Sequence, residues 1–171
     1  FIPSYFLQNN VKKYYNMDKA IPQDLPSISA LNTMKKDFNM ATTHFIILDD
    51  KITEANINAL TSELNNVEGV TNVLSLNSFI GTAIPSAMLP DSIKEICVQD
   101  GKQLMMLNSS YSAATDEENA QIEKITSIVK KYDEGGILTG EGVLTKDLIT
   151  VAEKDFVVTG AISMLAIFIL V

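Results

Sequence analysis

The sequence predicts an α+β fold of the ferredoxin-like type, with the element order β-α-β-β-α-β. Two observations favour it. A strand-helix-strand pattern occurs once in the first half of the chain and again in the second. The two helical stretches also match one another when displaced by 65 positions, which pairs Ile57 with Ile122 and Thr61 with Thr126. We therefore expect an antiparallel sheet that carries both helices on one face.

The first unit opens with Thr43–Leu48, a β-branched and aromatic run that ends at two aspartates, as a strand before a turn does. Thr53 supplies a helix N-cap, and Gly69 ends the helical stretch. The second strand is expected at Val70–Leu76. The apolar residues of the helix recur at the spacing of one helical face and are Ile57, Leu60, Leu64 and Val67.

The second unit begins with a strand expected at Lys102–Ser109 and closes with one at Ile137–Val143. The glycines of the closing strand mark a bulge or a close approach of two backbones. Thr115 and Glu118 form a T-x-x-E capping box, and Gly135–Gly136 ends the helix. The apolar face of this helix consists of Ile122, Ile125, Val129 and Tyr132.

Three attachments surround this predicted core. A helix is expected at Ser27–Phe38, directly after Pro26. A long connection, Phe79–Gly101, carries a short helix at Ser92–Cys97. A last helix is expected from Thr145 onward, and it continues into the apolar C-terminal run.

The C-terminal run, Phe156–Val171, contains sixteen residues without a charge. A membrane-spanning helix needs about 20 apolar residues, and small residues such as Gly160 allow membrane helices to approach closely. We therefore interpret residues 153–171 as the start of a transmembrane helix. The alternative is a buried C-terminal helix or strand of a soluble domain, which a run of this length also permits.

This interpretation divides the chain into three parts and makes it a piece of a longer polypeptide. Residues 1–26 are expected to hold the exit of a preceding membrane helix and a linker, because the opening FIPSYFL is too short for a signal sequence. Residues 27–152 form the folded domain, and residues 153–171 start the next membrane helix.

The charge pattern argues against nucleic acid as a partner. The net charge is −8, and all 13 basic residues are lysines. The chain therefore lacks the arginine forks that suit phosphate and guanine. Cys97 is the single cysteine, so no intrachain disulfide can form, and cysteine pairing does not indicate a compartment.

Four stretches carry a family resemblance: Asn16–Phe38, the strand HFIILDD, the strand GVTNVLSL and, most specific of all, TGEGVLTKDL at Thr139–Leu148. Over nearly its whole length the chain resembles the MMPL (mycobacterial membrane protein large) type transporters of the RND superfamily. It departs from the family pattern at Gly142, where alanine is often found, and we expect no functional consequence.

The resemblance implies that residues 27–152 are the first extracytoplasmic porter domain of a multi-pass protein of the cell membrane. It implies export of lipids, drugs or other hydrophobic molecules, driven by proton flow through acidic residues of later helices outside this chain. Asp155 is not one of those residues. The implied partners are the lipid bilayer, a hydrophobic cargo, the remaining transmembrane helices and a second porter domain of the same chain.

Candidate catalytic residues are few. Cys97 and His44 could form a nucleophile-base pair, and the carboxylates at Asp49–Asp50 and Asp116–Glu118 could serve a metal or acid-base chemistry. We favour structural roles, because free cysteine is common in cores and acidic residues complement turns and helix N-termini. The sequence has no phosphate loop, zinc spacing or nucleophile elbow. We expect that the chain is not an enzyme and that it has no catalytic residue, no metal site and no cofactor.

Methionines are the candidate contacts for a hydrophobic cargo, because methionine lines adaptable binding surfaces. Met105 and Met106 lie in a predicted strand, and Met88 lies beside Leu89 in the long connection. Alternate strand residues face opposite sides of a sheet, so at least one of Met105 and Met106 is expected in the core.

Two other functions share this fold. The chain could be an extracytoplasmic ligand-sensing or regulatory loop domain of another membrane protein, such as an ABC-type permease. It could also be a soluble ACT-like regulatory domain. A fold alone does not separate these functions from a transporter domain.

Overall fold

The computed structural model describes residues 21–76 and 97–170. In chain order the elements are α3 (Pro26–Asp37), β1 (Thr42–Asp49), α4 (Glu54–Asn65), β2 (Val70–Leu74), β3 (Val98–Gln99), β4 (Lys102–Ser109), α7 (Asp116–Tyr132), β5 (Ile137–Gly140) and α8 (Glu141–Leu170).

The sheet has the strand order β2-β4-β1-β5, and every pair in it is antiparallel. Short β3 pairs with β4 outside this path. With β3 set aside, the four remaining strands of the two strand-helix-strand units have the order of a ferredoxin-like sheet, in which the first and third strands are central. The predicted α+β fold is therefore confirmed.

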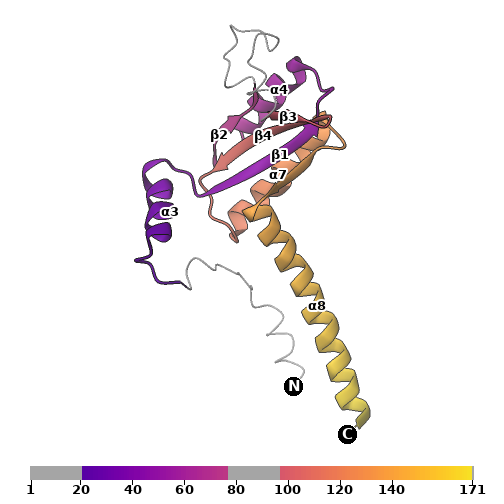
Figure 1. The fold of residues 1–171 in the computed structure, drawn as a ribbon. Coiled ribbons are helices and arrows are strands. Elements are labelled where there is room, and N and C mark those ends of the chain that lie inside the picture. Colours follow the sequence, from indigo (N-terminus) through magenta and orange to yellow (C-terminus); the bar gives the residue numbers. More distant parts are fainter. Residues whose placement is uncertain (1–20, 77–96, 171) are drawn as a thin grey trace.

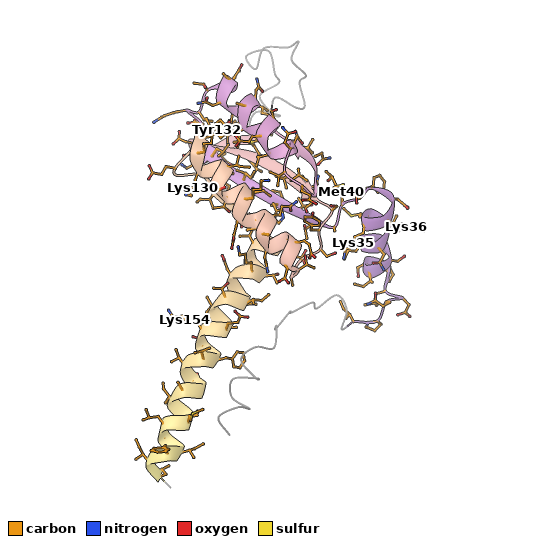
Figure 2. The ribbon with its side chains drawn as sticks, turned by 180° about the vertical axis from the view of Figure 1, so that it is seen from behind. Lys35, Lys36, Met40, Lys130, Tyr132 and Lys154 are labelled. Atoms are coloured by element: carbon orange, nitrogen blue, oxygen red, sulfur yellow. The ribbon has the colours of Figure 1, made fainter. Side chains whose placement is uncertain are left out.

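Helices α4 and α7 cover one face of this sheet. Figure 1 shows the strands in front, and Figure 2, seen from behind, shows the two helices in front. Residues on β1 alternate between buried and half-buried, because successive side chains point to opposite faces. The core between sheet and helices is built from aliphatic side chains that include Ile46, Leu60, Leu64, Leu107 and Ile125.

Both predicted N-caps are present. The Thr53 hydroxyl accepts a hydrogen bond from the Asn56 amide, and the Thr115 hydroxyl accepts one from the Glu118 amide. The Glu118 carboxyl has no hydrogen-bond partner among the described residues, so the reciprocal half of the predicted capping box is absent. Its side chain points into the domain instead of back along the helix.

The predicted closing strand was too long. It ends at Gly140, and α8 begins at Glu141, four residues before the expected start at Thr145. Gly140 has φ +138°, a conformation that side-chain-bearing residues rarely adopt and that turns the chain out of the sheet. Glu141 then suits the first turn of a helix, where the dipole favours a negative charge.

Strand β3 was not predicted. Asp100 and Gly101 both have positive φ, 51° and 73°, and they join β3 to β4 in a two-residue hairpin. An Asp-Gly pair is a strong hairpin signal, because this turn requires positive φ at both central positions. The expected helix at Ser92–Cys97 lies outside the described residues except for Cys97, and so do residues 1–20 of the expected membrane-helix exit and linker at residues 1–26.

Helix α8 contacts α7, β1 and β5 at its start and then leaves the body of the domain as a long single helix (Figure 1). Lys154 lies on the part that projects beyond the sheet (Figure 2). The apolar side chains that follow are exposed, among them Leu165 and Phe168. Within the described ranges, no helix is both long enough and apolar enough to cross a membrane.

Candidate functional site

A histidine and a glutamate meet inside the domain, close to the start of α8. His44 lies on β1, on the side that faces the helices, and its strand neighbours are Leu107 on β4 and Gly140 on β5. Glu118 is the third residue of α7, in the first turn. His44 Nε2 and Glu118 Oε1 are 3.7 Å apart, and both side chains are fully buried. We call these residues the His44–Glu118 pair.

The glycines of the TGEG motif cover this pair. A β-carbon at Gly140 would lie 2.7 Å from the Thr43 carbonyl oxygen and 3.1 Å from the His44 Cα. A β-carbon at Gly142 would lie 2.6 Å from the carboxyl carbon of Glu118. The backbone at the β5–α8 junction thus approaches both members of the pair more closely than any side chain would allow, which fits the predicted close approach of two backbones.

Burial determines the electrostatics of the pair. None of the side-chain nitrogens and oxygens of His44 and Glu118 has a hydrogen-bond partner among the described residues. Burial lowers the pKa of His44 from 6.5 to about 4. Burial also raises the pKa of Glu118, and the negative charge of Glu141 adds to this; the nearby polar groups of Thr42 and the Ala114 backbone, which do not reach hydrogen-bonding geometry with the carboxyl, act in the opposite direction. Each group is thus shifted toward its neutral form.

Several other buried polar side chains in this part of the domain have hydrogen-bond partners. The Thr42 hydroxyl donates to the Tyr111 carbonyl at 2.9 Å. The Ser109 hydroxyl donates to Gln121 Oε1 at 2.7 Å, and Gln121 Nε2 donates to the Glu68 carbonyl at 2.7 Å. Buried polar groups in proteins are normally satisfied in this way, so the His44–Glu118 pair, with four unpartnered side-chain atoms, needs an explanation.

A second contact fastens α8 to α7 one turn further on. Lys146 Nζ lies 2.9 Å from Glu123 Oε1 and donates to the Asn119 carbonyl at 3.3 Å. This contact lowers the pKa of Glu123. Glu123 is largely exposed, so the ion pair itself is a weak tether in water. The packing of Gly142 on Glu118 is the buried part of the α7–α8 contact.

Replacing Gly142 by alanine should destabilise the domain by about 1–3 kcal/mol, the usual range for overpacking. The Glu118 carboxyl is fully buried and cannot swing into solvent to make room. Urea unfolding of Gly142→Ala would measure the loss. In a Glu118→Ala background the same replacement should be close to neutral, because the obstructing carboxyl is gone. An equal loss in both backgrounds would show that Glu118 is not what excludes the methyl group. Glycine at position 142 therefore has a packing reason that the sequence did not show.

The opposite face of the sheet is apolar, and no described helix covers it. The register pairs Phe45 with Met106, Ile47 with Leu104 and also with Ile137, and Leu74 with Met106. We call this surface the open face of the sheet. Its residues are half-buried except Ile137, which is 56% exposed. The open face consists of Phe45, Ile47, Leu74, Leu104, Met106 and Ile137.

The structure separates the three candidate methionines. Met105 is fully buried in the core between sheet and helices. Met106 lies on the open face, half-buried beside Phe45 and Leu74. Met88 lies outside the described residues. The expectation that one of the adjacent methionines belongs to the core is therefore met by Met105.

Cys97 and His44 do not come together. Cys97 directly precedes β3, and β3 and β1 lie on opposite sides of β4. Their register positions on β4 differ by about three residues, which places them roughly 10 Å apart along the strands and roughly 10 Å apart across them. Burial also raises the pKa of the Cys97 thiol, which opposes formation of a nucleophilic thiolate.

The carboxylate clusters have local partners. Asp49 accepts a hydrogen bond from the Lys51 amide at 3.0 Å, which lowers the pKa of its carboxyl, and it faces Lys102 at 3.8 Å. In the other cluster Asp116 and Glu117 are exposed, and Glu118 is buried against His44. Within residues 21–76 and 97–170, no three side chains of the metal-binding types come together to hold an ion.

Sequence reasoning missed the His44–Glu118 pair, although a signal for it was present. Glu118 is in phase with Ile122, Ile125 and Val129, so it belongs to the buried face of its helix. His44 lies two residues before buried Ile46 in β1 and therefore on the same, core-facing side of the strand. Both residues also lie near the ends of their elements, where polar side chains are common, and this masked the signal.

The fold, the open face and the projecting helix together define a ferredoxin-like α+β domain attached to a long helix with an apolar end. The sequence profile of the MMPL family matches residues 19–171. The chain therefore belongs to the MMPL family, whose members are membrane transporters related to the RND type and normally not enzymes. A comparison with curated proteins gave no match.

Proposed function

We propose that residues 27–152 are the extracytoplasmic porter domain of an RND/MMPL-like transporter that exports lipids, drugs or other hydrophobic molecules by proton-driven transport. The observation that carries the proposal is the open face of the sheet. It presents Phe45, Leu104 and Met106 as one continuous apolar surface that no described helix covers. Large exposed apolar patches are typical of surfaces that contact a ligand or another chain.

The open face suits a cargo of varied shape. Met106 lies between Phe45 and Leu74, and its flexible thioether can adapt to different apolar groups. Thr139, the register partner of Phe45, lies on this face and provides a hydroxyl group for a polar end of the cargo. A path for amphipathic molecules needs both features.

The path of α8 supports the proposed division of the chain. The helix starts on the sheet at Glu141 and continues without interruption into the apolar segment that begins at Phe156. We propose that residues 153–171 are the start of a transmembrane helix and that residues 1–26 connect the domain to a preceding one. A rigid connection of this kind lets movement in a membrane region reach the porter domain directly.

Placing a charge on the open face should reduce export more than it reduces stability. In the whole transporter, Met106→Glu should lower the export rate about tenfold or more, because an unpaired carboxylate next to an apolar cargo weakens its binding by more than about 1.4 kcal/mol. The measurement is export of a fluorescent hydrophobic substrate from cells with matched expression.

Two matched variants make this test specific. Ser127→Glu adds the same charge at an exposed position of α7, on the other side of the sheet, and should leave export unchanged. Met106→Leu keeps an apolar side chain of similar size and should do the same. Normal export by a folded Met106→Glu protein would exclude the open face as part of the cargo path.

A further inference from the structure

The His44–Glu118 pair has properties that a purely structural pair would not need. Its two groups are fully buried, 3.7 Å apart, and without hydrogen-bond partners among the described residues. The start of α8 lies directly on the carboxyl through Gly142. An apolar pair of the same volume would be at least as stable here, because buried ionisable groups rarely add stability.

We propose that His44 and Glu118 form a proton-binding site that holds one shared proton, and that gain or loss of this proton loosens the contact between α8 and α7. This inference concerns the domain itself and does not depend on the proposed transport. The ligand is the proton, and the element that responds is α8.

Charge balance explains why one proton is held. With one proton the pair is neutral overall, either as imidazole with carboxylic acid or as imidazolium with carboxylate. A second proton makes the site +1, and loss of the proton makes it −1. Burial opposes both charged states, so it widens the pH range over which a single proton is bound.

The groups around the pair do not compensate for the unfavourable burial of a charged pair. Glu141 on α8 disfavours a negative Glu118, and the N-terminus of α7 favours it. Lys146 is engaged with Glu123 and the Asn119 carbonyl, one turn away. Asn119 Oδ1 is buried without a partner. The other neighbours that the structure places against the pair carry no charge and include Leu107 on β4, Thr42, Ala114, and the glycines Gly140 and Gly142.

A charged pair would require water, and the close cover over the carboxyl leaves no room for it. A β-carbon at Gly142 would already overlap the Glu118 carboxyl group. Hydration of the charged site therefore requires the first turns of α8 to move away from α7. The state of the pair would in this way be transmitted along α8 to the apolar segment at its far end.

The pH dependence of unfolding tests the shared proton. Between pH 4.5 and 6.5 the unfolded chain also holds one proton on these two residues, because free histidine is protonated and free glutamate is ionised. The native pair holds the same number, so the pair should make no contribution to the pH dependence of the wild-type unfolding constant. Replacing either residue alone should make the unfolding constant depend on pH, with opposite signs in the two variants.

In Glu118→Gln, His44 stays neutral in the native state and is protonated on unfolding. Stability should therefore be full above pH 6.5, and the unfolding constant should rise by up to tenfold per pH unit as pH falls toward about 4. In His44→Gln, Glu118 stays protonated in the native state. The unfolding constant should then rise as pH increases above 4.5, until the raised native pKa of Glu118 is passed.

The experiment uses the full chain in detergent micelles, with unfolding followed by circular dichroism from pH 4 to pH 9. The double variant should lose both dependences, and Glu117→Gln, the exposed neighbour on α7, should match the wild type. Slopes of the same sign in the two single variants, or equal slopes in Glu117→Gln and Glu118→Gln, would overturn the proposal.

A second measurement reports on the pair and on α8. His44 is the single histidine of the chain, so nitrogen NMR of its ring is unambiguous and should show a titration near pH 4 instead of 6.5. Hydrogen exchange at the amides of residues 145–148, corrected for intrinsic rates, should lose protection by up to tenfold per pH unit outside the single-proton range. Protection that does not change with pH, or that falls equally in the double variant, would contradict a link between the pair and α8.

Discussion

Replacing Met105 by glutamate should leave the domain unfolded at neutral pH, whereas the same replacement at Met106 should leave it folded. Met105 is fully buried among Ile46, Leu107 and Ile125, and no described basic residue is part of that cluster. An unpaired charge there should destabilise by more than about 4 kcal/mol, a large part of the stability of a small domain. Met106 lies half-buried on the open face, where a carboxylate can reach water, and we expect a loss of about 1 kcal/mol.

Urea unfolding followed by circular dichroism measures this contrast. Met105→Leu is the control, because a swap of similar volume in a core should destabilise by less than about 1.5 kcal/mol. If both glutamate variants were folded, Met105 would not lie in the core between sheet and helices. If both were unfolded, the open face would be buried in the native protein, and the proposed cargo surface would be lost with it.

The strands were predictable because their side chains alternate. The run from Thr42 to Asp49 has strand-forming residues throughout, and its buried positions occur at every second residue. Helix α7 was equally clear, since its apolar positions recur with a helical period after an N-cap at Thr115. The order of these elements was sufficient to predict a ferredoxin-like sheet.

The junction between β5 and α8 could not be predicted in the same way. The sequence ILTGEGV allows a strand through Val143 with a bulge at its glycines. The structure ends the strand at Gly140, because that residue leaves the sheet with φ +138° and packs against the Thr43 carbonyl. Such a contact depends on β1, nearly 100 positions earlier in the chain, which no local pattern reports.

The His44–Glu118 pair could not be predicted from local sequence patterns either, because its two residues are distant in the sequence. Whether a histidine and a glutamate meet depends on which strand a helix crosses, and this is a property of the whole fold. Glu118 in the first turn of α7 fitted a capping role as well as a buried one. The packing of Gly142 on its carboxyl decided between these two roles. Phase along the helix was the one local signal that pointed to burial.

Replacing Leu165 by aspartate should prevent normal membrane insertion of the apolar segment of α8. On insertion scales an aspartate at the centre of a membrane helix is unfavourable by about 3 kcal/mol, which corresponds to roughly a hundredfold lower insertion. The measurement is modification of a glycosylation tag in the segment that follows: correct insertion places the tag on the cytoplasmic side, where it stays unmodified, and failed insertion leaves it on the same side as the domain, where it is modified. Leu148→Asp is the matched control, because Leu148 lies on the same helix before the apolar run and is 58% exposed, close to the 63% of Leu165. Equal insertion of the two variants would contradict a membrane role for residues 153–171, and the exposed apolar side chains of α8 would then have to be covered by another protein surface.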